Sequence, residues 1–255
     1  MNRALFLPIR NLIRDGETAK ALERLSDDKY KSDPLRDLFI AVCSEHDQLS
    51  LWEKAVQELS KEAPSEELLF ALERASFFSK EGKDQVRLRQ YLKRASDLSD
   101  RLGKSERFLE YQSIYANRLL CDGYLEKAQE ILHDIIVLAQ EQNHSLLLIS
   151  QGVVLSSLLM NQQKWVAAAS LSIIIEEAAR DRENWIALAC AVMMRASCWH
   201  AQKRSQLSVQ LLLRCGRELY EQGAVSALNL IKARLAELKT LIGDARFNEY
   251  CRVET

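Results

Sequence analysis

The chain has 255 residues, of which 35 are Lys or Arg and 36 are Asp or Glu, so its formal net charge is -1. Proteins that neutralise many nucleic-acid phosphates usually carry a basic excess, and the most basic stretch here, residues 83–94, is interrupted by Asp84. Nucleic-acid binding is therefore not expected. Only 8 Gly and 3 Pro are present, with no proline after Pro64, which favours helix almost throughout because proline removes a helix hydrogen bond.

Cysteine usage and hydropathy predict a cytoplasmic protein without a membrane span. The 6 cysteines form no C-x-x-C pair, so reduced thiols in a reducing compartment are the simplest account. Arg10 and Arg14 interrupt the apolar run near the start, which argues against a signal peptide. Residues 143–163 hold no formally charged side chain, but about half of them are polar. A helix buried inside a helical protein is expected there, since a membrane span would be predominantly apolar.

The first hundred residues contain divergent copies of one pattern, in which a small residue is followed by larger apolar residues at helical spacing. The small residue would let a facing helix approach closely. In the third copy, Arg87 stands where a second helix would open with a small residue. In chain order, the copies are Asp15-Gly16 before Ala21 and Leu25; Leu51 to Ala55 with Leu59; and Ala75 with Phe78, Gly82 and Tyr91.

The second half repeats the pattern regularly, with copies forty residues apart twice in succession. The first helices contain Ala116 to Leu119, Ser156 to Leu159 and Ala196 to Trp199, each beginning with a small residue. An antiparallel helix pair leaves an apolar face uncovered, so successive pairs are expected to stack. Each second helix carries a small residue near its start, a second position four residues later and a third position near its end: Ala128, Ala168 and Ser208; Leu132, Ser172 with Ile173, and Leu212; and Ala139, Ala179 and Leu219. A last first helix spans 227–242, contains Ala236 and precedes Gly243.

The segment from Tyr115 to Leu132 resembles the tetratricopeptide repeat, in which a small-x-x-apolar step, a turn often holding Gly and an Ala-x-x-x-apolar step follow one another. The resemblance covers most of the chain. It implies an all-α fold of antiparallel helix pairs stacked as a right-handed TPR-like superhelical solenoid, with about six pairs and a terminal helix. One domain, 1–255, would contain divergent repeats at about 5–100, regular repeats at about 105–243 and a C-terminal helix at 245–253.

The chain departs from the family pattern in three respects. The usual repeat is about 34 residues, whereas the later copies here run forty. The first-helix tryptophan is absent, with Gln112 and Gly152 at the expected positions, and the prolines that close each repeat are missing. These departures leave open the alternative of a non-repetitive helical bundle.

In tetratricopeptide arrays the first helices line a concave groove that binds partners, and matching positions carry this expectation over. The carboxylate clamp of that family is not expected, because Asn117 matches its asparagine but Ser113 replaces its lysine. A mostly apolar groove suits the apolar face of a helix or an extended apolar segment. The expected groove residues are Leu69, Leu72, Ser76, Ser113, Asn117, Leu120, Val153, Ser157, Met160, Asn161, Met193, Ser197 and His200.

Two arginines stand at positions where sister repeats have apolar residues such as Leu155 and Val42. Arg74 and Arg195 are predicted either to extend outward or to reach a carboxylate on the next repeat. If they face the groove, they would anchor an acidic partner. An alternative occupant of the groove is the C-terminal helix of the same chain, Phe247 to Val253.

No catalytic or metal-binding arrangement is apparent. The histidines, His46, His133, His144 and His200, fall in different repeats, and Cys198 and His200 point to different helix sides. The adjacent acids Glu176 and Glu177 also diverge, and one of them is expected to pair with Arg180. No phosphate-binding loop, dinucleotide fingerprint or nucleophile motif is present. We expect no enzyme activity, no metal and no cofactor.

The sequence thus predicts a non-enzymatic adaptor or scaffold that holds a partner protein or peptide. Two alternatives stay open: a secretion-type chaperone for an export substrate, and a peptide-sensing regulatory module. A homodimer through an uncapped terminal repeat is a further expectation, since Leu5-Phe6-Leu7 is apolar whereas Arg252 to Thr255 is polar.

Overall fold

The computed structural model describes residues 3–44, 49–81 and 84–252, and every regular element in these ranges is helical. The described chain packs as two compact units, Met1–Gly123 and Tyr124–Thr255. The prediction of an all-α protein is confirmed. Gly82 of the third predicted copy, His46 and the last residues of the predicted C-terminal helix lie outside the described residues. The assignment of residues 1–255 to a single domain stays a prediction.

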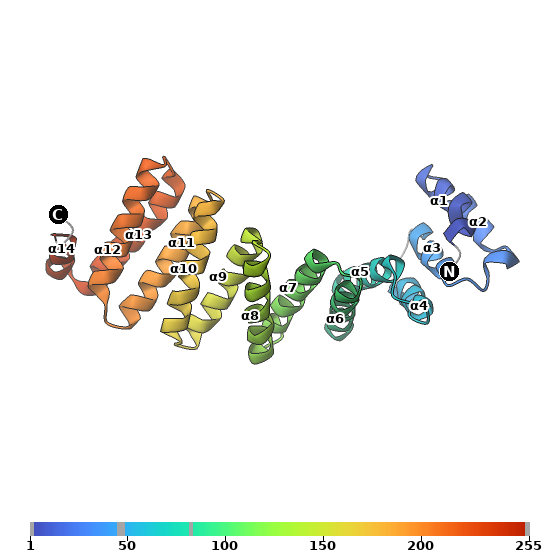
Figure 1. Ribbon diagram of the computed structural model, residues 1–255, viewed down its shortest axis with the longest axis horizontal. Coiled ribbons are helices and arrows are strands. Elements are labelled where there is room, and N and C mark those ends of the chain that lie inside the picture. Colours follow the sequence, from blue (N-terminus) through green and yellow to red (C-terminus); the bar gives the residue numbers. More distant parts are fainter. Residues whose placement is uncertain (1–2, 45–48, 82–83, 253–255) are drawn as a thin grey trace. The chain divides into compact units, whose positions relative to one another are not determined.

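The first unit consists of consecutive helices of unequal length, each packed against the next (Figure 1). At its start, the rings of Phe6, Tyr30 and Phe39 form a buried cluster, with the Phe6 centroid 5.1 Å from each of the other two. Phe6, which belongs to the apolar segment near the start of the sequence, is therefore part of the core of the first unit. The elements are η1 (Arg3–Phe6), α1 (Leu7–Arg14), α2 (Thr18–Leu25), η2 (Asp28–Tyr30), α3 (Leu35–Cys43), α4 (Leu49–Leu59), α5 (Glu66–Glu81), α6 (Gln85–Arg101) and α7 (Ser105–Cys121).

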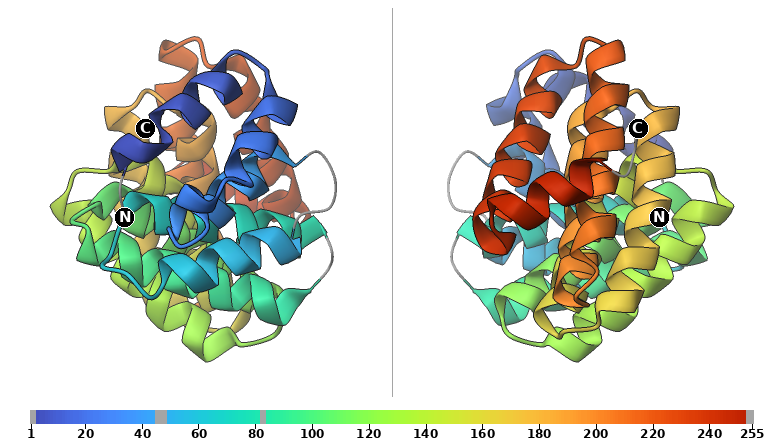
Figure 2. Two further views of the ribbon diagram at one scale, coloured as in Figure 1. Left: turned by 90° about the vertical axis from the view of Figure 1, so that its right-hand side faces the viewer. Right: turned by 90° about the vertical axis from the view of Figure 1, so that its left-hand side faces the viewer.

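The second unit is a row of antiparallel helices in which first helices of successive pairs also touch: α9 contacts α11, and α11 contacts α13. The short last helix packs on α12 and α13 (Figure 2). Helices α9 with α10 and α11 with α12 form the predicted pairs. The elements are α8 (Leu125–Glu141), α9 (Ser145–Asn161), α10 (Trp165–Asp181), α11 (Trp185–Ala201), α12 (Ser205–Glu221), α13 (Val225–Ile242) and α14 (Asp244–Arg252).

The turns explain the forty-residue repeat. Each helix from α7 to α12 has 17 residues and is followed by a three-residue turn. The middle turn residue is left-handed, and paired backbone bonds close the helix: Glu183 N–H donates to Arg180 O at 2.9 Å, and Asn184 N–H donates to Ala179 O at 2.8 Å. The left-handed residues recur every twenty positions, at Gly103, Gly123, Asn143, Gln163, Glu183, Lys203, Gly223 and Gly243.

The predicted small residues lie where helices cross. Ser156, Ala168, Ala196 and Ser208 are fully buried, and the Ser208 hydroxyl of α12 donates to the Ala196 carbonyl of α11 at 2.6 Å. At Gly152, a Cβ atom would lie 2.8 Å from Cγ1 of Ile175, so α9 and α10 approach too closely there for a larger residue. The packing reason for the repeat is thus confirmed. Among the described residues, every helix is too short or too polar to span a bilayer.

Candidate functional site

The second unit contains a groove of about 450 Å³ between α9, α11 and α13. Its surface is mainly apolar and rich in sulfur, and it includes three of the 4 methionines in the sequence. Methionine is unbranched and polarisable, so it can adapt to irregular apolar surfaces. The lining residues are Met160, Cys190, Met193, Met194, Ser197, Leu230, Ala233, Arg234 and Glu237.

The repeat accounts for this lining. On α11, Cys190 is followed at i+3, i+4 and i+7 by the other lining residues of that helix, so all project from one face. The same spacing begins at Leu230 on α13, forty residues later. Corresponding faces of two successive first helices therefore form one wall of residues, and Met160 of α9 completes it.

The polar part of the groove is a connected set of three side chains. Arg234 donates from Nη2 to the Ser197 hydroxyl at 2.9 Å and from Nη1 to Glu237 Oε2 at 2.6 Å. The Ser197 hydroxyl donates in turn to the Met193 carbonyl, at 2.7 Å. The Arg234 Nε atom is buried and has no acceptor among the described residues. Arg234 is thus a partly buried cation at the edge of an apolar surface.

Of the residues predicted for this groove in the second unit, Met160, Met193 and Ser197 line it. Val153 is half-buried, Ser157 and Asn161 are exposed on α9, and none of the three belongs to the lining. His200 is held by a hydrogen bond between its Nδ1 and the Ser205 hydroxyl, at 2.9 Å. The sequence interpretation missed the α13 residues, although the forty-residue register leads from Met194 to Arg234 and from Ser197 to Glu237.

In the first unit the predicted groove positions are corrected. Leu69, Leu72, Ser76 and Ser113 are buried in the helix packing, and the Ser113 hydroxyl donates to the Leu109 carbonyl. One position along an α-helix turns a side chain by about 100°. The neighbouring residues are therefore the exposed ones: Phe70, Phe77 and Ile114 are each more than 40% exposed. Asn117 and Leu120 are half-buried on α7.

The two predicted anchors are already engaged within their own units. Arg195 of α11 donates to Glu176 Oε2 of α10 at 2.8 Å, and its guanidinium lies 5.3 Å from the Trp199 ring centroid. Its partner is on the preceding helix pair, whereas the prediction placed a carboxylate on the next repeat. The Arg74 guanidinium lies 5.2 Å from the ring centroid of Phe77, 5.3 Å from that of Phe78 and 5.8 Å from that of Trp52. Neither residue lines the groove.

Glu176 occupies an unusual position for a carboxylate, since only 3% of its side chain is exposed. Burial raises its pKa to about 7, while the positive charges of Arg195 and Arg180 lower it. The predicted pairing with Arg180 is present at 3.9 Å, and Arg180 also bonds Glu218 at 2.8 Å. Burial, with the nearby acids, raises the pKa of the Cys215 thiol to about 12. These ion pairs join α10 to α11 and α10 to α12 within the helix packing.

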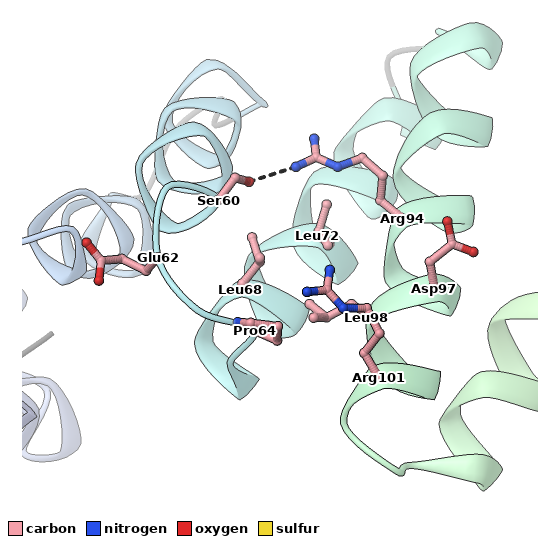
Figure 3. Close-up of a pocket in the computed structure, with 9 residues that line it drawn as sticks. All are labelled: Ser60, Glu62, Pro64, Leu68, Leu72, Arg94, Asp97, Leu98 and Arg101. Atoms are coloured by element: carbon pink, nitrogen blue, oxygen red, sulfur yellow. Dashed lines mark hydrogen bonds between the residues drawn. The ribbon is translucent and has the colours of Figure 1, made fainter.

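A smaller pocket of about 300 Å³ lies in the first unit between the α4–α5 connection, α5 and α6 (Figure 3). Arg94 reaches across it and donates to the Ser60 hydroxyl at 2.7 Å. Leu68, Leu72 and Leu98 contribute its apolar floor. Arg94, Asp97 and Arg101 follow one another on the surface of α6, which is the pattern of a solvated helix face. The methionine-lined groove is larger and more apolar than this pocket.

The described residues hold no cluster of three or more His, Cys, Asp or Glu side chains that could bind a metal ion. All six cysteines are free thiols, and Cys43, Cys198 and Cys215 are buried. The C-terminal helix α14 contacts α12 and α13, and none of its residues lines the groove. The alternative in which this helix fills the groove is therefore wrong for its described part, Asp244–Arg252.

No protein-family model and no curated protein matches the sequence. Solved structures do match the fold. The TPR-like repeats of a protein described as a kinesin light chain from Podosopora anserina are 14% identical, with 92% of this chain and 95% of that chain covered at a TM-score of 0.51. The apo form of RapI is 12% identical, with 92% and 95% covered at a TM-score of 0.54. The fold is TPR-like, as the sequence resemblance indicated.

Proposed function

We propose that this protein is a non-enzymatic interaction module that holds an apolar or amphipathic segment of a partner protein in the groove of α9, α11 and α13, and so acts as an adaptor or scaffold. The observation that carries the proposal is the groove itself, which Met160, Met193 and Met194, all half-buried, line together on first helices of successive pairs. Stacked helical repeats commonly use such faces for binding.

The chemistry of the groove fits a protein ligand better than a reaction. Its polar groups are a hydroxyl bonded to its own helix, a guanidinium and an exposed carboxylate. No nucleophile is paired with a base there, since Cys190 has a pKa raised by burial and is therefore a neutral thiol. Leu230 keeps part of its apolar surface open to water, and covering this surface with a partner is favourable.

A selection on the full chain tests the proposal. Peptides are selected from a random display library, and their binding is followed through methionine methyl signals in NMR spectra, because three of the 4 methionines line the groove. Met193→Glu should weaken binding by about tenfold or more, since the ligand would have to cover a charge.

The matched control is Val166→Glu, which places the same charge at a site on α10 that is 71% exposed. This variant should bind selected peptides as the wild type does. Selected peptides that shift none of the groove methionines, or that bind Met193→Glu with unchanged affinity, would contradict the proposal.

A further inference from the structure

We infer that the groove takes an α-helix rather than an extended segment, and that this helix carries an acidic side chain beside its apolar stripe, placed to meet Arg234. The inference rests on the proposed function and specifies the class of partner for the same groove. Two independent observations lead to it: the scarcity of hydrogen-bonding groups along the groove, and the incomplete bonding of Arg234.

The first observation concerns the backbone of the ligand. An extended segment carries an N–H and a C=O at every residue, and buried groups of this kind need partners. The groove is built from three helices whose own backbone groups bond within each helix, so it offers no strand edge. Side chains would have to supply every bond to an extended ligand.

The available side chains cannot do so. Six of the nine lining residues, Met160, Cys190, Met193, Met194, Leu230 and Ala233, offer no strong hydrogen-bonding group. The hydroxyl protons of Ser197 and of nearby Ser157 are donated to the carbonyls of their own helices, at 2.7 Å and 2.9 Å. Only Arg234 and Glu237 are left to form hydrogen bonds with the ligand backbone, and both lie on α13.

A helical ligand avoids this cost, because its backbone bonds are internal and only its side chains meet the groove. Its apolar residues at i, i+3 or i+4, and i+7 would pack on the methionines, which can adjust to their shapes. Such a ligand matches a groove whose lining residues repeat with the same spacing on α11 and α13.

The second observation concerns Arg234. Its side chain is 23% exposed, and its carboxylate partner is Glu237, which is 62% exposed and three residues further along the same helix. Ion pairs of this exposed kind are weak. Its other partner is the neutral Ser197 hydroxyl, and its Nε has no acceptor among the described residues.

A guanidinium has five N–H donors and binds carboxylates in a fixed planar geometry. Arg234 therefore retains donors for a second acceptor while it borders the apolar surface. A carboxylate on the edge of a bound helix would supply this acceptor in a setting from which the ligand excludes water. Of the cationic side chains in the described residues, Arg234 is the one that lines this groove.

The helical form is tested with two display libraries of equal size on the full chain. One presents randomised positions on a stable helical hairpin, and the other presents unconstrained peptides with a central proline, which disrupts helix. We expect binders that depend on Met193 from the helical library only. Proline-containing binders of equal or higher affinity that also depend on Met193 would overturn the inference and leave the proposed function in place. Absence of Met193-dependent binders from both libraries would overturn both proposals.

The acidic contact is tested on the tightest helical binder by replacing its acidic residue with the matching amide. The dissociation constant should rise about tenfold for the wild-type protein and stay unchanged for Arg234→Ala. Lys232→Ala is the matched control, because Lys232 lies on the same helix but outside the groove, and it should respond like the wild type. Selected helices without an acidic residue, or equal responses of wild type and Arg234→Ala, would overturn the contact.

Discussion

Both units are built from helices, but helix lengths and turns are more regular in the second unit than in the first. In the first unit, α1 to α4 have between 8 and 11 residues, and only from α5 onward do the helices reach 16 or 17. In the second unit, α8 to α12 have 17 residues each, and their turns follow one design. Equal helices with equal turns bring the same helix face back every forty residues. This recurrence is what forms the groove wall on α11 and α13.

The units also hold half-buried arginines in different ways. Arg74 lies among three aromatic rings in the first unit, whereas Arg195 in the second bonds a buried carboxylate. Contacts between a half-buried cation and aromatic rings are weak, so the protein should lose little stability when Arg74 is replaced. Removal of Arg195, in contrast, leaves a buried carboxylate without its nearest partner. The regular unit therefore depends on one charged pair at a repeat position that is apolar in its neighbour.

The largest expected effect comes from Arg195→Leu. At pH 8 it should lower the free energy of unfolding by about 3 kcal/mol, because Glu176 stays buried with only a distant partner. The double variant Glu176→Ile with Arg195→Leu should recover this loss, since the equivalent residues forty positions earlier are Ile136 and Leu155, both buried. Denaturant unfolding measures both.

Arg74→Leu is the comparison from the first unit and should cost only about 1 kcal/mol. Equal losses for Arg74→Leu and Arg195→Leu would contradict the distinction drawn between the two arginines.

The next effect is a dependence on pH. Burial raises the pKa of Glu176 from 4.5 to about 7, so between these values the folded protein keeps a proton that the unfolded chain releases. Its contribution to stability is therefore largest at low pH and is lost as pH rises through this window. From pH 5 to 8 the wild type should lose roughly 1–3 kcal/mol relative to Glu176→Gln. Parallel curves of unfolding free energy against pH for the two proteins would exclude this role of Glu176.

A third prediction concerns the close crossing in the regular unit. Gly152→Ala should lower stability by about 1–3 kcal/mol, because the new Cβ would press on the Ile175 side chain. In an Ile175→Ala background the same substitution should cost little, since the obstructing atoms are gone. A double-mutant cycle measures the coupling, and additive losses would show that this contact does not limit helix approach.

The smallest effects are expected at the turns. Gln163 and Lys203 adopt left-handed backbone, with φ of 59° and 63°, where Gly223 also lies at 67°. Gln163→Gly or Lys203→Gly should stabilise the protein by up to about 1 kcal/mol, and Gly223→Ala should destabilise it by about 1 kcal/mol. Thermal unfolding measures all three. If the substitutions to glycine destabilised the protein and Gly223→Ala stabilised it, the turn residue would not control the length of these helices.

Much of the fold could be predicted from residue pattern, because the causes are local. Helix geometry explains three of these signals: the absence of proline after Pro64, the forty-residue spacing of Ala168 and Ser208, and the position of Gly243 after the last long helix. The twenty-residue turn period was missed, because four of its left-handed positions are occupied by Asn143, Gln163, Glu183 and Lys203 in place of glycine. At these four positions, helix packing imposes a left-handed backbone conformation that residues other than glycine usually avoid.

The candidate site was predicted less well. Met160, Met193 and Ser197 could be located by register, yet Leu69, Leu72, Ser76 and Ser113 are buried instead of exposed. A difference of one position decides between core and surface, and apolar residues occur on both sides of these helices. Periodicity alone could not separate the face that packs on the next helix from the face that stays open.

The sequence by itself therefore determined the helices, their pairing and the forty-residue register, since these follow from interactions within a few turns of chain. Only the tertiary structure decided which face of α11 and α13 stays open, that Arg195 turns to Glu176, and that Arg234 remains at the groove. The reason is that burial and charge pairing depend on distant neighbours, such as Glu176, 19 residues from Arg195, and Ser197, 37 residues from Arg234, and their distances are set by packing.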